Sequence, residues 1–447
     1  MRMTAFTKAL LVGFLVLLLL IPLQMVRSVI DERQARHREA IAEVSQVWGG
    51  TQRLVGPVLV VPFRVSYRDD KDRVHVRVER AEFLPERLEV DGNAVPEVRK
   101  RGLFEVVVYR LDLSLSGRMP APDFASLGVA PEDVVWDEAS LAFGIPDTRG
   151  IKEELKLSWD GGETPFRPGP GDGGLFATGI HAPLTGLKAG SAPHPFAFHL
   201  TVQGSQSVEV APVAIETGVR LKSSWKSPSF QGAFLPEKRA IDAGGFTAAW
   251  RVSYFGRSVP QAFRADSNDP KVVAASLEAS SFGVVFFQPV DHYQQATRAV
   301  KYGVLFVALT FLAFFLFEVI ASLRLHPIPY LLVGLALALF YLLVVSLSER
   351  IGFGPAYLSA AVATVALVSL YAVRLLEKKG RAVLVAAGLS GLYGYLYVLL
   401  RREDDALLLG SLALFATLAA IMYATRNVDW SRATSPLERE EVPPILT

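Results

Sequence analysis

The sequence contains no cysteine and almost no net charge. Its 447 residues include 46 Lys and Arg against 44 Asp and Glu, so the formal net charge is only +2. The lack of thiols excludes disulfide bonds and cysteine chemistry, and it suits a domain exported to an oxidising compartment. The near balance of charge gives no indication of nucleic-acid binding.

Motifs of the common catalytic and cofactor sites are also missing. There is no His-Glu-x-x-His helix, no Gly-x-Ser-x-Gly elbow and no Walker loop, because the glycines at 169–174 lack a following Lys-Ser/Thr. His194 and His199 stand five apart, but His199 falls in an alternating strand pattern, which favours a structural role over a metal site. The sequence therefore predicts no catalytic residue, no cofactor and no metal.

Long apolar runs dominate the last third of the chain. Five segments of about 20 residues, the length a helix needs to cross a bilayer, lie at 303–323, 328–348, 351–373, 382–400 and 406–425. The connections between them are short, so consecutive helices are expected to pack antiparallel as a five-helix block.

A sixth apolar run lies near the N-terminus, at 9–26. A cleaved signal peptide is the alternative, but the run is long and no small-x-small pattern precedes Arg27. We therefore expect an uncleaved transmembrane anchor, which makes six transmembrane helices in all.

Side chains within the spans suggest how the helices pack. Lipid tails are as apolar as Leu, so helix association is expected to depend on small residues at helical spacing, such as Ala356, Ala360 and Thr364 in one span and Ala386, Ser390 and Gly394 in the next. Tyrosines near span ends are expected to act mainly as anchors in the headgroup zone: Tyr302, Tyr330, Tyr357, Tyr393, Tyr397 and Tyr423.

Residues 27–48 contain no Pro or Gly, and Glu32 precedes Arg36 by four residues, a spacing that supports a helix. Apolar positions are sparse in this segment. It is expected to be a juxtamembrane helix that forms a solvated stalk, or alternatively lies along the headgroups.

Short alternating runs broken by Gly, Pro, Asn and Asp extend over residues 49–298. Val74, Val76 and Val78 alternate with polar residues, and the stretches 111–116 and 196–202 repeat the pattern. This period of two is typical of β-strands. It predicts a large, mainly antiparallel β domain, sandwich-like or built from two packed sheets, with 160–174 as a flexible loop or an internal boundary.

The distribution of Lys and Arg in the short loops predicts the topology. The charges favour a cytoplasmic N-terminus at 1–8 and a cytoplasmic tail at 426–447. The anchor at 9–26, the juxtamembrane helix at 27–48, the periplasmic β domain at 49–298 and the transmembrane block at 299–425 complete the predicted organisation.

Glu318 is the only charged residue inside the five C-terminal spans. An acid at that depth is by default a functional hypothesis. A structural lock, with a hydrogen bond from a neighbouring helix or a pair with Arg324 or Arg374, is the favoured interpretation, and a proton or ion relay is the alternative. The other candidate polar residues lie at span ends: Arg324, Glu349, Arg350, Glu403 and Asp404.

Several runs resemble the CreD family of bacterial inner-membrane proteins. They include Leu-Ile-Pro-Leu-Gln-Met-Val-Arg from residue 20, Trp-Gly-Gly-Thr-Gln from residue 48, Ser-Trp-Lys-Ser-Pro-Ser-Phe-Gln-Gly from residue 224 and Thr-Arg-Asn-Val-Asp-Trp from residue 425. The likeness covers almost the whole chain. Pro329 and Asp405 depart from the family pattern, in which Gln and an aromatic residue are expected.

The resemblance implies a multi-pass protein of the inner membrane, linked to cell-envelope integrity, envelope stress and altered tolerance of envelope-directed toxins and β-lactams. No accepted biochemical activity comes with it. The expected function is non-enzymatic, with the lipid bilayer and a periplasmic or inner-membrane protein as partners and no nucleic acid. A small-molecule or ion transporter is the alternative, and an envelope-modifying enzyme is a further one.

Overall fold

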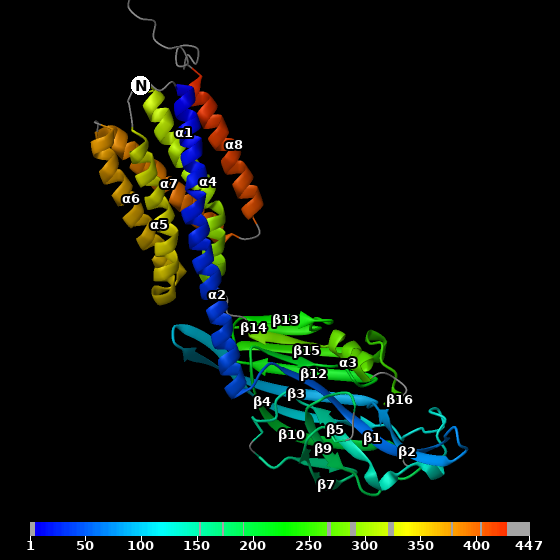
Figure 1. The fold of residues 1–447 in the computed structure, drawn as a ribbon. Helices are drawn as coiled ribbons and strands as arrows, with labels where there is room; N and C mark the ends of the chain where they lie inside the picture. The colour runs from blue at the N-terminus through cyan, green and yellow to red at the C-terminus, as the bar shows by residue number, and fades with distance from the viewer. Residues whose placement is uncertain are drawn as a thin grey trace, which may run out of the picture. The chain divides into compact units, whose positions relative to one another are not determined.

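The computed structural model describes residues 5–426 except 152, 172–173, 191, 266–269, 287–291, 321–325, 377–378 and 403–404. The chain divides into two compact units. One consists of Met1–Arg36 with Val290–Thr447, and the other of His37–Pro289. Figure 1 shows both units and labels many of their elements.

The first unit is helical. It contains α1 (Ala5–Leu18), the first part of α2 (Leu20–Trp48), α4 (His292–Ile320), α5 (Pro327–Ile351), α6 (Phe353–Leu375), α7 (Lys379–Arg401) and α8 (Ala406–Thr425). As the short connections predicted, α4 packs against α5, α5 against α6, α6 against α7 and α7 against α8. Helix α1 packs against α4 and α5.

The number of candidate membrane spans is smaller than predicted. Within the described residues, five helices are long and apolar enough to cross a membrane, the first of them in Thr7–Trp48 and the others in α4 to α7. The predicted sixth span, 406–425, forms α8 over its full length of 20 residues, and the apolar part of it that the structure describes is Leu407–Ala419. The count of candidate spans among the described residues is therefore five and not the predicted six.

The buried faces of the helices only partly follow the expected stripes of small residues. Ala356, Ala360 and Thr364 are buried on α6, as predicted. On α7, however, Ser390 and Gly394 are exposed. Apart from Ala382, the buried residues of that helix have larger side chains, namely Val385, Leu389, Tyr393, Leu396, Leu399 and Leu400.

The second unit consists mainly of two sheets. One contains β1 (Gln52–Arg68), β2 (Val74–Phe83), β5 (Ser140–Gly144), β8 (Arg167–Pro168), β9 (Gly179–Pro183), β11 (Ser207–Val210), β13 (Pro228–Gly232), β16 (Ala262–Arg264) and β17 (Phe282–Phe286). The other contains β3 (Arg87–Arg101), β4 (Phe104–Met119), β6 (Lys156–Trp159), β7 (Gly162–Pro165), β10 (His194–Ser205), β12 (Glu216–Ser223), β14 (Lys238–Asp242) and β15 (Gly245–Ser253).

Most strand pairs are antiparallel, which confirms the predicted fold class. The exceptions among the described strands are β1 with β11 and β3 with β12, which pair in parallel. Alternation places Leu111, Leu113 and Leu115 of β4 in the core, with polar residues between them. The segment 160–174 is not simply a flexible loop, because its first part closes the β6–β7 hairpin and continues into β8.

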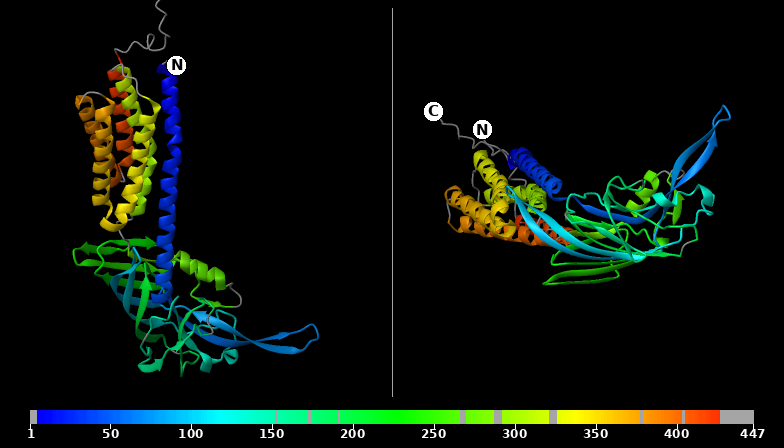
Figure 2. Two further views of the ribbon diagram at one scale, coloured as in Figure 1. Left: turned by 60° about the vertical axis from the view of Figure 1, so that its left-hand side comes forward. Right: turned by 90° about the horizontal axis from the view of Figure 1, so that it is seen from below.

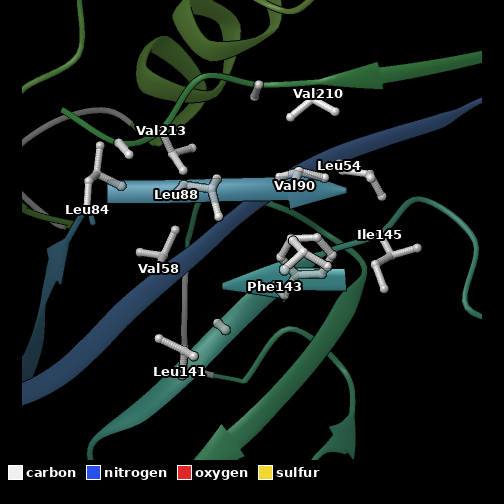
Figure 3. Close-up of a cluster of buried hydrophobic side chains, with 14 of the residues drawn as sticks. Leu54, Val58, Leu84, Leu88, Val90, Leu141, Phe143, Ile145, Val210 and Val213 are labelled. Atoms are coloured by element: carbon white, nitrogen blue, oxygen red, sulfur yellow. The ribbon is translucent and has the colours of Figure 1, made fainter. Parts of the chain in front are cut away.

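The core of this unit is formed by side chains from both sheets. Figure 3 shows Val58 and Leu54 of β1, Leu88 and Val90 of β3 and Phe143 of β5 in one cluster. At about 25 cal/mol per Å² of buried apolar surface, such side chains stabilise the pairing of the two sheets.

The end of α2 is attached to the β unit and is not a solvated stalk, which corrects that expectation. Ser45 Oγ lies 2.7 Å from Ser205 Oγ, and the Trp48 indole N–H donates to the Tyr109 carbonyl at 3.3 Å. The Arg99 guanidinium lies 4.1 Å from the centre of the Trp48 ring. These polar and cation–π contacts hold a helix face that has few apolar residues.

Candidate functional site

Glu318 lies in the last turn of α4 and is buried. Its carboxylate pairs with the Lys8 ammonium of α1, and its second oxygen accepts a hydrogen bond from the Tyr330 hydroxyl of α5 at 3.0 Å. Two further rings surround the phenol, because Phe311 and Phe314 pack edge-on against Tyr330 with ring centroids 5.6 and 6.2 Å away. The acid thus joins three helices in apolar surroundings.

Local sequence explains how Tyr330 reaches this position. Helix α5 begins at Pro327. Proline is tolerated in the first turn of a helix, because a backbone N–H at that position would have no partner within the helix. His326 precedes it and accepts a hydrogen bond from the Ile328 amide. Tyr330 therefore stands in the first turn of α5, next to the last turn of α4.

A second polar group connects α4 and α5 at their opposite ends. Glu349, in the last turn of α5, accepts a hydrogen bond from the Tyr293 hydroxyl of α4 at 3.0 Å. The Arg33 guanidinium of α2 lies 3.7 Å from the same carboxylate. Like the Lys8–Glu318–Tyr330 group, it combines one acid, one cation and one phenol.

The two groups are separated by about the thickness of a bilayer. Lys8 and Arg33 are 25 positions apart on α1 and α2, or about 38 Å at 1.5 Å per residue, and Tyr293 and Glu318 are equally far apart on α4. A hydrocarbon core is about 30 Å thick. The charged groups are therefore positioned at the two ends of the apolar section, where charge is least costly.

The other predicted polar residues have varied positions. Arg350 is exposed in the last turn of α5, and Arg374 lies in the last turn of α6. Arg324, Glu403 and Asp404 lie outside the described residues. Sequence reasoning missed Lys8 as a partner of Glu318, because no local pattern relates residues 310 positions apart.

The predicted role of several tyrosines as headgroup anchors is wrong. Tyr330, Tyr357 and Tyr393 are almost completely buried. The Tyr357 hydroxyl donates to the Tyr393 carbonyl at 2.7 Å, and the Tyr393 ring lies 4.5 Å from that of Phe340. A buried phenol can pack its ring in the helix interior when its hydroxyl has a partner there.

In the β unit, the outer halves of β1 and β2 form a two-stranded ribbon, visible in Figure 2 as a blue projection from the sheets. Their register places three pairs directly opposite each other: Arg64 with Val78, Ser66 with Val76, and Arg68 with Val74. Residues opposed in an antiparallel pair point to the same side, so these six side chains form one surface, which we call the ribbon face.

The ribbon face is exposed although half of it is apolar. Val74, Val76 and Val78 are 62%, 60% and 53% exposed. Neither outer edge of the ribbon is paired with another described strand, since β16 reaches only residues 81–83 of β2 and β5 only residues 55–60 of β1. Unpaired edges beside exposed apolar side chains favour association with another chain.

Asp69 holds the turn at the tip of the ribbon. Its carboxylate accepts hydrogen bonds from the amides of Lys71 and Arg73 at 2.9 and 3.0 Å, and from the Arg73 guanidinium at 2.9 Å. His75 Nε2 lies 3.1 Å away. The Arg73 amide and the His75 ring lower the pKa of Asp69 to about 2, so the turn keeps its anion at neutral pH.

The two histidines considered as metal ligands, His194 and His199, lie in the part of the chain that the structure describes. No group of three or more His, Asp or Glu side chains is placed there to hold a metal ion. His194 pairs with Asp160 and stacks on Trp159, and His199 is hydrogen-bonded to Ser114.

Comparison with known proteins gives a family match over almost the whole chain. The model of the family described as "Inner membrane protein CreD" matches residues 4–431. The inner membrane protein CreD of Escherichia coli (strain K12) is 35% identical over 426 residues, which cover 94% of this chain and 92% of that protein.

Solved structures show only distant likeness. An M1 zinc metallopeptidase from Deinococcus radiodurans, in a substrate-bound and a free form, aligns with 45% of this chain and 42% of its own. The TM-scores are 0.22 and 0.21 and the identities 9% and 8%. A likeness this weak supports no argument about fold or activity.

Proposed function

This chain belongs to the CreD family of inner membrane proteins, and from that premise we propose that it is a non-enzymatic envelope protein whose β domain binds a protein partner. It is a multi-pass protein of the inner membrane. The helices anchor the β domain, and the ribbon face is the surface that recognises the partner.

The ribbon face is the observation that carries this proposal. Three exposed valines lie on a strand pair with free edges, beside the guanidinium groups of Arg64 and Arg68. Arg68 already pairs with Asp72 at 2.7 Å, whereas Arg64 is exposed and forms no ion pair with a described residue. A partner that presents apolar side chains next to carboxylates complements this surface.

The proposal includes an orientation, with the N-terminus in the cytoplasm and the β domain in the periplasm. The support is the positive-inside rule. Arg374, Lys379 and Arg381 cluster around the α6–α7 connection, while the α5–α6 connection carries Arg350. In this proposal, the chain supports envelope integrity by binding its partner on the periplasmic side of the membrane.

Complementation of a bacterium that lacks the protein tests the proposed function. The full chain should restore tolerance of an envelope-directed toxin or β-lactam, whereas a Val74→Ser/Val76→Ser/Val78→Ser variant should fail at equal membrane abundance. A variant with Val95→Ser and Val98→Ser, two exposed valines of β3, is the matched control and should complement. Full complementation by the ribbon variant would refute the role of this surface.

A further inference from the structure

A groove in the helical unit lies between α2 and α4. It has a volume of about 780 Å³ and is lined by residues of both helices. Leu20, Leu23 and Val304 form apolar parts of its wall, and the cations Arg27 and Lys301 also line it. The groove therefore combines an apolar section with positive charge.

The two cations lie at the same depth. Lys8 pairs with Glu318 near the end of α4, and Arg33 lies in the same polar group as Tyr293 near its start, so α1 and α2 run antiparallel to α4. Arg27 is 19 residues from Lys8 along α1 and α2, and Lys301 is 17 residues from Glu318 along α4. At 1.5 Å per residue these separations are about 28 and 26 Å. Both charges therefore stand near the membrane surface at which α2 continues toward the β unit, about 10 Å beyond Leu20.

Both cations are available to a ligand. Arg27 and Lys301 are exposed, and neither forms an ion pair or a side-chain hydrogen bond with any described residue. Other cations of the helical unit do have acidic partners, such as Lys8 with Glu318 and Arg33 with Glu349. Gln24 and Ser28 also line the groove and add hydrogen-bonding groups next to the charges.

From this geometry we infer that the groove is a binding site for an anionic phospholipid. The phosphate and headgroup lie between Arg27 and Lys301, and an acyl chain follows the apolar wall toward Leu20. A zwitterionic lipid offers the same acyl chains but no net negative charge, so the two cations give the site its selectivity. The site is independent of the ribbon face and of the proposed partner.

Native mass spectrometry of the detergent-purified full chain tests this inference. The probes are phosphatidylglycerol and phosphatidylcholine with identical palmitoyl and oleoyl chains. The wild-type chain should bind phosphatidylglycerol more tightly. An Arg27→Gln/Lys301→Gln variant should lose about 30-fold in affinity for phosphatidylglycerol, as expected for two surface cations, with little change for phosphatidylcholine.

Two further variants make the test specific. Arg350→Gln removes an exposed cation at the same end of the helical unit but outside the groove, and it should bind like the wild type. Val304→Trp fills the groove without a change of charge, and it should weaken the binding of both lipids. Equal binding of the two lipids by the wild type, full binding by the double variant, an equal loss in Arg350→Gln, or no effect of Val304→Trp would each overturn the inference.

Discussion

Lys8 and Glu318 are 310 residues apart in the sequence, yet their side chains form an ion pair that joins α1 to α4. Tyr330 adds α5 to the same group. The Arg33–Glu349–Tyr293 group at the other end joins α2, α5 and α4. An apolar bundle in lipid lacks a hydrophobic force between its helices, so such polar contacts help to specify which helices pack together.

The structural-lock hypothesis predicts how substitutions of Glu318 behave. Glu318→Gln should keep most folded protein, because the amide still accepts the Tyr330 hydroxyl and Lys8 can extend its ammonium to the membrane surface. Glu318→Leu also leaves the buried Tyr330 hydroxyl without its acceptor, and an unsatisfied buried polar group costs about 1–3 kcal/mol. Membrane abundance of the two variants is the measurement.

A charge exchange provides the control. Lys8→Glu combined with Glu318→Lys should recover abundance that Lys8→Glu alone loses. If Glu318→Gln accumulated normally but failed to complement, the lock would be wrong and the relay hypothesis would be preferred.

The ribbon turn should respond to acid in a defined range. Because the folded pKa of Asp69 is lowered from 3.8 to about 2, its stabilising contribution is complete above pH 3.8 and disappears as the pH falls through about 2. Amide NMR signals of Lys71 and Arg73 should therefore keep their folded shifts to about pH 3 and move below it. Asp69→Ala should show the shifted signals at neutral pH, and an unchanged spectrum would contradict the role of the carboxylate.

The soluble form of the β unit should require the end of α2 for its full stability. A fragment 37–289 retains the interactions of Ser45 and Trp48, whereas a fragment 50–289 lacks both residues. If these interactions stabilise the unit by about 2 kcal/mol, the shorter fragment should unfold roughly 4–8 °C lower. Both should give β-rich circular dichroism spectra. Equal melting temperatures would show that the helix end contributes nothing.

The proposed orientation can be tested without background labelling, because the chain has no cysteine. In intact cells, an impermeant thiol reagent should label Leu235→Cys, which is 69% exposed on the β unit. It should leave Lys379→Cys, at the start of α7, unlabelled until the cells are opened. Labelling of Lys379→Cys from outside would reverse the orientation.

Much of the fold follows from the periodicity of the sequence. Apolar runs of about 20 residues become α4 to α7, and period-two alternation in 111–116 becomes a core-facing strand. The same alternation at Val74 to Val78 also forms a strand, yet its valines are exposed. Alternation indicates the strand, but only its position in the sheet decides which side chains are covered.

Side-chain partners within the bundle could not be predicted from local sequence. Tyr357 and Tyr393 resemble headgroup anchors by their positions, but each finds a partner across the helix interface. Glu318 could be singled out as an isolated acid, whereas Lys8 looked like an ordinary flanking cation of the first span. Packing between distant segments, and not residue type, determines these roles.

Site-specific photocrosslinking in living cells tests the central claim most directly. A photoreactive benzoylphenylalanine at Val76 should yield a discrete adduct with one protein, and this adduct should disappear when Arg64→Glu and Arg68→Glu reverse the charge beside it. The same probe at Leu235, exposed elsewhere on the β unit, should not give that adduct. No adduct at Val76, or the same adduct from Leu235, would contradict partner binding at the ribbon face.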